Sequence, residues 1–87
     1  MVSFSIVLSI KAQSEFKKLP LELQVRIKKK LKDSMENPFR HFERLKSRVD
    51  YKLRVGDYRI IADIINSSKQ IEITKIGHRK NVYKNLD

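Results

Sequence analysis

The sequence predicts an α+β domain in which two helices from the N-terminal half pack on one face of a small, mainly antiparallel four-stranded sheet (β-α-α-β-β-β). Three patterns predict it: an alternating apolar segment at the start, a four-residue apolar repeat in residues 20–36, and three alternating segments separated by turns. A chain of 87 residues supplies one hydrophobic core, because it buries only about 60–65% of its unfolded surface. We therefore expect a single domain over residues 1–87.

The N-terminal segment is expected to form the first strand, over residues 3–9. Phe4, Ile6 and Leu8 alternate there with neighbours that are mostly more polar, which is typical of a strand with one buried face. The same segment lacks the basic start and long apolar run of a signal peptide, and no apolar stretch approaches about 20 residues. The sequence thus predicts a cytoplasmic protein with no membrane-spanning segment.

Two helices are expected to follow. Ser14 is expected to cap a short helix that runs to Leu19, and Pro20 then ends it and opens the next helix, because its fixed φ suits a first turn. The second helix has one apolar stripe, formed by Leu23, Ile27, Leu31 and Met35. It is expected to end at Asn37-Pro38, because a residue before proline disfavours the helical conformation. Residues 39–48 are expected to form an irregular connection.

Three strands are expected in the C-terminal half, at about residues 49–55, 58–65 and 70–77. Gly56-Asp57 fits a two-residue hairpin turn, and residues 66–69 separate the second and third of these strands. The first strand of the chain precedes a helical crossover, so it can pair in parallel with a later strand. The sheet can therefore be mixed.

The chain is strongly basic, with 20 Lys and Arg residues against 10 Asp and Glu residues and a net charge of +10. Such a charge opposes compaction, and solubility, a membrane surface and a polyanion are the candidate reasons for it. A membrane surface requires a sustained amphipathic basic helix, which is only half present, whereas arginines around the strands favour a polyanion. The chain has no cysteine and two histidines, so we expect no disulfide, no metal and no cofactor.

The predicted hairpin sets like charges opposite each other. A turn at Gly56-Asp57 pairs Arg54 directly with Arg59 and Lys52 with Ile61, on the side of the ribbon away from the core. Opposed like charges cost about 0.2–1 kcal/mol, unless an anion or a neighbouring carboxylate offsets the repulsion. Either arginine alone is explained well enough by splaying into water or by pairing with an aspartate.

More charged and polar residues follow the last strand, namely His78, Arg79 and Tyr83. Guanidinium groups match pairs of phosphate oxygens, so a cluster of these residues with the opposed arginines favours a phosphate-binding site. Tyr83 can take part in this site or merely anchor the C-terminal tail, and the sequence leaves both interpretations open.

Two segments together resemble the signature of the RelE/ParE toxin superfamily, and they are closest to RelE-type mRNA interferases. The segments are Tyr51-Lys52-Leu53-Arg54-Val55-Gly56-Asp57-Tyr58-Arg59-Ile60-Ile61 and Ile76-Gly77-His78-Arg79-Lys80-Asn81-Val82-Tyr83. Leu19-Pro20, Asn37-Pro38 and Leu45-Lys46 also stand where such toxins carry similar residues. The resemblance covers nearly the whole chain and implies two helices against a curved, mainly antiparallel sheet.

The resemblance also implies an activity, namely metal-independent cleavage of mRNA in the ribosomal A site by attack of a ribose 2′-OH on the adjacent phosphate. By resemblance, the catalytic residues are Arg59, Arg79, Tyr83 and Lys52, and the RNA-binding residues are Arg54, His78 and Lys80. The implied partners are mRNA, the ribosome and an acidic RelB-like antitoxin that forms a hetero-oligomer with the toxin.

Two other functions fit the same residues. A ParE-like toxin that inhibits DNA gyrase without being an enzyme would use the cationic cluster for binding alone. A plain RNA-binding module needs only the charge, but the few aromatic residues available for base stacking weaken this interpretation.

Overall fold

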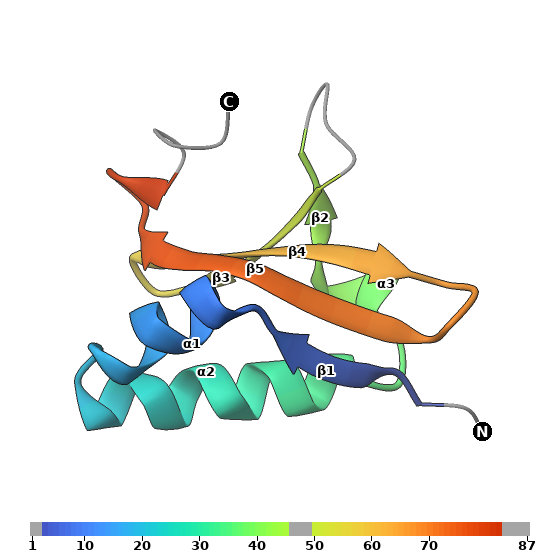
Figure 1. The fold of residues 1–87 in the computed structure, drawn as a ribbon, viewed down its shortest axis with the longest axis horizontal. Coiled ribbons are helices and arrows are strands. Elements are labelled where there is room, and N and C mark those ends of the chain that lie inside the picture. The colour runs from blue at the N-terminus through green and yellow to red at the C-terminus, as the bar shows by residue number, and fades with distance from the viewer. Residues whose placement is uncertain (1–2, 46–49, 83–87) are drawn as a thin grey trace.

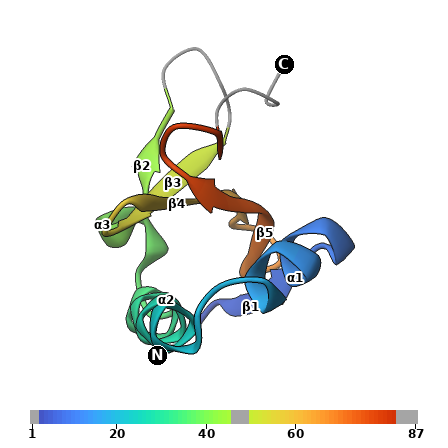
Figure 2. The same cartoon turned by 90° about the vertical axis from the view of Figure 1, so that its left-hand side faces the viewer.

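The computed structural model describes residues 3–45 and 50–82, which form three helices and one five-stranded mixed sheet. In chain order the elements are β1 (Ser5–Leu8), α1 (Ile10–Lys17), α2 (Leu21–Ser34), α3 (Pro38–His41), β2 (Glu43–Arg44), β3 (Tyr51–Val55), β4 (Tyr58–Ile65) and β5 (Gln70–His78). The strand order is β1-β5-β4-β3-β2, in which β1 runs parallel to β5 and the other pairs are antiparallel. Helices α1 and α2 lie on one side of the sheet (Figure 1), and the sheet curves so that β1 comes down beside them (Figure 2). The predicted α+β class is confirmed.

The prediction of four strands and an irregular connection is wrong. Residues 38–41 form the helical turn α3, which begins at a proline because proline lacks the N–H that a first helical position leaves unpaired. Glu43 and Arg44 then pair with Lys52 and Tyr51 as strand β2. Two residues are too few to produce a period-2 pattern, so the sequence gives no signal for this edge strand.

The predicted bounds of the first helix are also wrong. Helix α1 begins at Ile10, because Ser9 caps it: the Ser9 Oγ accepts a hydrogen bond from the Ala12 N–H at 3.1 Å. The same hydroxyl donates to the Thr74 carbonyl at 3.3 Å, which ties the start of α1 to β5. The helix ends at Lys17 rather than at Leu19.

The core lies between the helices and one face of the sheet. The predicted apolar stripe of α2 supplies Ile27 and Leu31, which are buried, and Leu23, which packs at the edge. The sheet and the segments around it supply most of the rest, namely Phe4, Phe42, Leu53, Val55, Ile60, Ala62, Ile64, Ile71, Ile73 and Ile76. Burying side chains of this size stabilises the fold by about 1.5–3 kcal/mol each.

Strand β5 contains one extra residue, which makes a β-bulge. Ala62 pairs with Ile73 but its neighbour Ile61 pairs with Lys75, so Thr74 has no partner residue on β4. The Thr74 Oγ1 donates to the Ile61 carbonyl at 3.2 Å and bridges the gap. A bulge exchanges the faces on which the following side chains lie, so Lys75 lies on the face opposite to Ile73.

Candidate functional site

The sheet has a second face, directed away from α1 and α2, which we call the outer face. In β3 the core residues Leu53 and Val55 alternate with Lys52 and Arg54, so these two cations lie on the outer face. The outer face is defined here by Lys52, Arg54, Arg59, Ile61, Lys75 and Gly77, which meet in cross-strand register. The predicted opposition of Arg54 to Arg59 and of Lys52 to Ile61 is confirmed.

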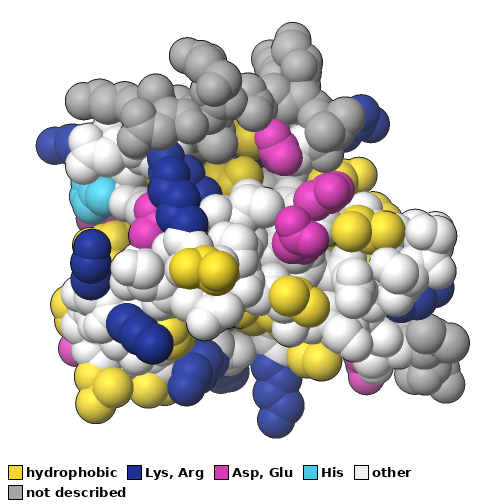
Figure 3. All heavy atoms as spheres, in the orientation of Figure 1, with side chains coloured by type: hydrophobic (Ala, Val, Ile, Leu, Met, Phe, Trp, Pro, Cys, Tyr) yellow, Lys and Arg dark blue, Asp and Glu magenta, His cyan; other side chains and the backbone are white. Residues whose placement is uncertain are grey.

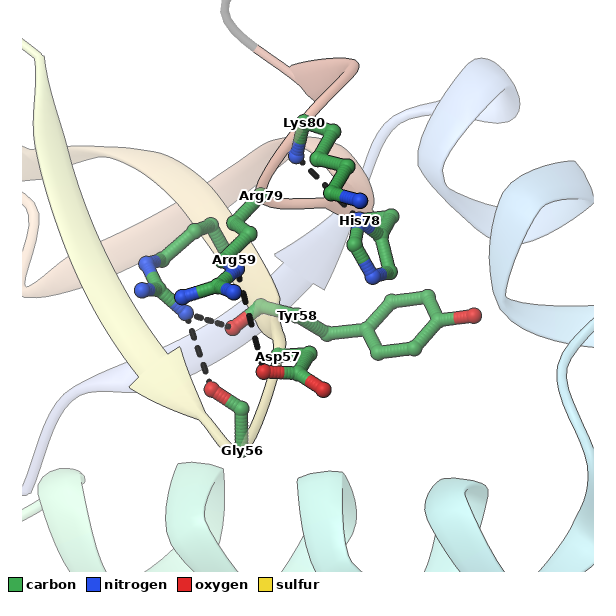
Figure 4. Close-up of polar contacts among 7 residues, drawn as sticks. All are labelled: Gly56, Asp57, Tyr58, Arg59, His78, Arg79 and Lys80. Carbon is green, nitrogen blue, oxygen red and sulfur yellow. Dashed lines mark hydrogen bonds and ion pairs between the residues drawn. The ribbon is translucent and has the colours of Figure 1, made fainter.

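The two opposed arginines differ in what they contact. The Arg59 Nη1 donates hydrogen bonds to the Gly56 carbonyl at 2.9 Å and to the Tyr58 carbonyl at 3.0 Å (Figure 4). Arg54 is exposed and pairs with no side chain among residues 3–45 and 50–82. Arg59 is therefore held in place at the hairpin turn, whereas Arg54 adds an unneutralised charge beside it.

Arg79, the first residue after β5, is anchored to the same turn. Its N–H donates to the Asp57 carbonyl at 2.8 Å, and its Nε lies 3.8 Å from the Asp57 Oδ1 (Figure 4). Both side chains are exposed, at 56% for Arg79 and 68% for Asp57, and an exposed pair of this kind contributes at most about 1 kcal/mol. The Arg79 guanidinium can thus exchange this carboxylate for a phosphate at little cost. The sequence predicted Asp57 only as a residue of the hairpin turn and not as the partner of Arg79.

Lys52 lies one row away from the opposed arginines. Its Nζ is 3.8 Å from the Glu43 Oε2 on the edge strand β2, and the Lys52 side chain is 34% exposed. The apolar Ile61 is its partner on β4 and is fully buried. Lys52 is therefore an accessible cation on the outer face with a weak carboxylate partner.

His78 and Lys80 are not brought to the outer face with the arginines. His78 pairs with Tyr58, and their rings meet edge to face with centroids 5.5 Å apart (Figure 4). The His78 Nδ1 accepts a hydrogen bond from the Lys80 N–H at 3.2 Å, so a neutral His78 imidazole carries its proton on Nε2. Lys80 is exposed in the turn after β5.

The end of the described chain packs on the outer face. Val82 is 1% exposed, and a Cβ built on Gly77 would lie 3.3 Å from the Val82 Cβ. Gly77 is the partner of Arg59 on β5, so its missing side chain lets Val82 approach next to that arginine. Tyr83, which was predicted to complete the site, lies outside the described residues.

Lys75 is an outer-face residue that the sequence-based predictions missed, although a signal was present. The apolar residues of β5 stand at odd positions in Ile71 and Ile73 and at an even position in Ile76. Such a change of phase inside one strand indicates an inserted residue, because side chains alternate strictly between faces. Counting from Ile76 places Lys75 beside Gly77 on the outer face.

Two further features concern the described ranges only. Residues 3–45 and 50–82 contain no group of three or more His, Cys, Asp or Glu side chains arranged to hold a metal ion. In the same ranges, no helix combines the length and the apolar character required to cross a membrane. On the face of the molecule shown in Figure 3, Lys and Arg side chains gather along the helix layer and at the left-hand end of the sheet.

Several solved toxin structures are similar to this chain. The toxin–antitoxin complex RelBE2 from Mycobacterium tuberculosis matches with a TM-score of 0.82 and 21% identity, over 90% of this chain and 100% of that one. The intact E. coli RelBE complex matches with a TM-score of 0.76 and 20% identity, over 86% and 95% of the two chains. The archaeal RelE-RelB complex from Pyrococcus horikoshii gives a TM-score of 0.73 and 19% identity, over 91% and 98%. At these identities the likeness shows the fold.

The family is shown by a match of sequence. No curated protein sequence matches the chain. The family model described as the ParE toxin of the type II toxin–antitoxin system parDE, however, matches residues 6–83, which is most of the chain. With the predicted motifs on β3, β4 and β5 and the RelE-like fold around them, this chain belongs to the RelE/ParE superfamily of type II toxin–antitoxin toxins.

Proposed function

We propose that this toxin is an endoribonuclease that cleaves mRNA in the ribosomal A site and thereby inhibits translation in the cytoplasm. The observation that carries the proposal is the direct opposition of Arg54 and Arg59, with Arg79 anchored at the same turn. Opposed guanidinium groups destabilise the free protein, and a phosphate bound between them would remove that repulsion.

The reaction we propose is an internal transfer at phosphorus. The ribose 2′-oxygen forms a bond to the adjacent phosphorus, and the bond from phosphorus to the leaving 5′-oxygen breaks. A base takes the 2′ proton and an acid protonates the 5′-oxygen, so the products carry a 2′,3′-cyclic phosphate and a 5′-OH. Negative charge grows on the non-bridging oxygens in the transition state, where fixed cationic donors are most effective.

Each cation has a role in this scheme. Arg59 and Arg79 would hold the scissile phosphate, since both are fixed at the turn and guanidinium donates in pairs. Lys52 and Arg54 would contact the same or the neighbouring phosphate on the outer face. Tyr83 would stack on a base or exchange a proton with the reacting ribose.

His78 and Lys80 fit RNA binding better than chemistry. His78 lies at the end of the sheet next to Tyr58, on the opposite side of β5 from Gly77, and the Lys80 backbone N–H is bonded to its ring. We assign His78 to a hydrogen bond from its Nε2 to RNA, and Lys80 to a backbone phosphate.

The second candidate function is inhibition of DNA gyrase without catalysis. The match to the ParE toxin family model favours it, because the cations of the outer face would then bind a partner and no bond would break. The two candidates differ in two observables, which are the appearance of new RNA ends and the inhibition of supercoiling by gyrase.

The test is translation in a purified system programmed with a defined mRNA. The proposal expects cleavage at the codon in the A site, with 2′,3′-cyclic phosphate ends, and unaltered supercoiling by gyrase in a parallel reaction. Intact mRNA together with inhibited supercoiling would establish the second candidate instead.

We also infer that the toxin binds an acidic RelB-like antitoxin in a hetero-oligomer. The similar RelE structures from M. tuberculosis, E. coli and P. horikoshii are toxin–antitoxin complexes, and a net charge of +10 favours an acidic partner. An apolar hollow of about 260 Å³ between β1 and α2 offers a place for leucines, and Lys28 and Lys32 border it. The hollow is otherwise lined by Ile6, Leu8, Phe16, Leu31 and Met35.

The antitoxin can be identified by affinity purification of the tagged toxin from its native host and mass spectrometry of the bound proteins. The expected result is a small acidic protein whose complex with the toxin no longer cleaves mRNA. A co-purified protein that leaves cleavage at its full rate would contradict the inference.

A further inference from the structure

Lys75 is a buried lysine on the outer face whose charge has no partner among the described residues. The residue is 6% exposed, and its Nζ is shielded and has no hydrogen-bond partner in residues 3–45 and 50–82. Lysine is rarely buried to this degree without a partner, because removing an ammonium group from water is costly unless hydrogen bonds or an opposite charge replace the water.

The fold holds Lys75 in this position with three hydrogen bonds around the bulge. The Thr74 Oγ1 donates to the Ile61 carbonyl, and the Ser9 Oγ donates to the Thr74 carbonyl. On the other side of Lys75, the Ile76 N–H donates to the Glu15 Oε1 of α1 at 2.8 Å. The backbone groups next to the bulge are therefore hydrogen-bonded, and the Lys75 side chain lies on the outer face of the sheet and not on the core face.

The surroundings of Lys75 increase the electrostatic cost. Lys75 pairs with Ile61, whose other neighbour in the sheet is Lys52, so two lysines flank one apolar residue on the outer face. Arg59 pairs with Gly77, two positions along β5, and therefore lies diagonally next to Lys75. Asp63, two positions from Ile61 in the other direction along β4, also lies on the outer face but forms no hydrogen bond with the Lys75 Nζ. The buried charge of Lys75 is therefore unfavourable in the free protein.

We propose that Lys75 is a phosphate-binding residue for single-stranded RNA, and that the bulge in β5 places it in one row with Lys52 and beside Arg59. A phosphate would supply the hydrogen-bond acceptors and the negative charge that the buried ammonium lacks. Because the Nζ is shielded, the phosphate reaches it only when the side chains that cover it shift.

This inference rests on the proposed function only in taking RNA as the ligand, so its test measures binding and not cleavage. The probe is a fluorescent single-stranded RNA whose 2′ positions are methylated and which cannot be cut. The proteins are the wild type, Lys75→Met, and Lys11→Met on the exposed surface of α1, which removes one charge far from the outer face.

The expected result is a pair of opposite effects in Lys75→Met. Its affinity for RNA falls about tenfold or more, and the slope of log K against log salt becomes shallower by about 0.7, the loss of one phosphate contact. Its melting temperature rises by about 4 °C or more, because a buried unpaired charge is replaced by an apolar side chain of similar length. Lys11→Met should change both quantities little.

Three results would overturn the inference. They are RNA binding by Lys75→Met equal to that of Lys11→Met, a Lys75→Met protein less stable than the wild type, and a wild type that does not bind RNA. A loss of antitoxin binding with unchanged RNA binding falls under the first result and would assign Lys75 to the protein partner. A wild type that binds RNA through Lys75 but cuts no mRNA on ribosomes would contradict the proposed nuclease alone.

Discussion

Replacing Arg54 by threonine should stabilise the free toxin, because Arg54 faces Arg59 directly across β3 and β4. Arg54 forms no hydrogen bond or ion pair with residues 3–45 and 50–82, so the substitution removes repulsion and no polar interaction between described residues. Cross-strand pairs of like charge cost about 0.2–1 kcal/mol, and about 1 kcal/mol raises the melting temperature of a domain of this size by roughly 4–8 °C. The expected gain is therefore about 1–8 °C at low ionic strength.

The same change at Lys52 provides a matched control. Lys52 lies two positions before Arg54 on the same face of β3, so Lys52→Thr changes strand propensity in the same way. Its Nζ is 3.8 Å from the Glu43 Oε2 and it faces the apolar Ile61, so no directly opposed like charge is removed and a weak ion pair is lost. We expect Lys52→Thr to leave the melting temperature unchanged or slightly lower.

Calorimetry at low salt and at about 0.5 M salt tests this reasoning. The advantage of Arg54→Thr over Lys52→Thr should shrink at high salt, because exposed charges are screened over about 10 Å at 0.1 M and over less at higher salt. The stabilised variant should also bind RNA more weakly. An Arg54→Thr protein that is no more stable than Lys52→Thr at low salt would refute the idea that the opposed arginines repel each other.

Three further predictions concern activity and stability. Arg79→Ala should lower mRNA cleavage by about 10²–10³-fold, because it removes a donor to the scissile phosphate. The melting temperature should change little, because the ion pair of Arg79 with Asp57 is exposed. Translation assays with Arg79→Ala and with Asp57→Ala, the other member of the pair, check this prediction. Tyr83→Phe should retain more cleavage than Tyr83→Ala if Tyr83 stacks on a base, and equal losses would assign its hydroxyl to proton transfer. Ser9→Ala should lower the free energy of unfolding by about 1 kcal/mol in urea denaturation, because α1 loses its cap and β5 a hydrogen bond; Ser14→Ala, once expected to be the cap, should not.

The parts of the fold that the sequence predicted are those with a repeated local signal. The apolar stripe of α2 and the alternation in β3 and β4 each extend over several residues, and the Gly56-Asp57 turn fixes the register between the two strands. This register is sufficient to place Arg54 opposite Arg59. Lys52, Arg54, Arg59 and Ile61, four of the six residues that define the outer face, could therefore be predicted from the hairpin alone.

The missed features depend on single residues or on contacts between distant segments. Ser9 and Ser14 are both residues that can cap a helix, and the structure shows Ser9 as the cap of α1, where its hydroxyl also bonds to the Thr74 carbonyl of β5. His78 was predicted with the arginines because it is adjacent to Arg79 in sequence, but alternation along β5 puts it with Tyr58. Side chains adjacent in a strand lie on opposite faces, so proximity in sequence was misleading there.

The central claim is that the arginines of the outer face hold an RNA phosphate. The most direct measurement is an NMR titration of the Nε–Hε resonances of the arginine side chains with a short RNA that cannot be cut. We predict that the resonances of Arg59 and Arg79 shift together at the same RNA concentration, while that of Arg40 on α3 does not move. Shifts at Arg40 with unchanged resonances of Arg59 and Arg79 would contradict the account.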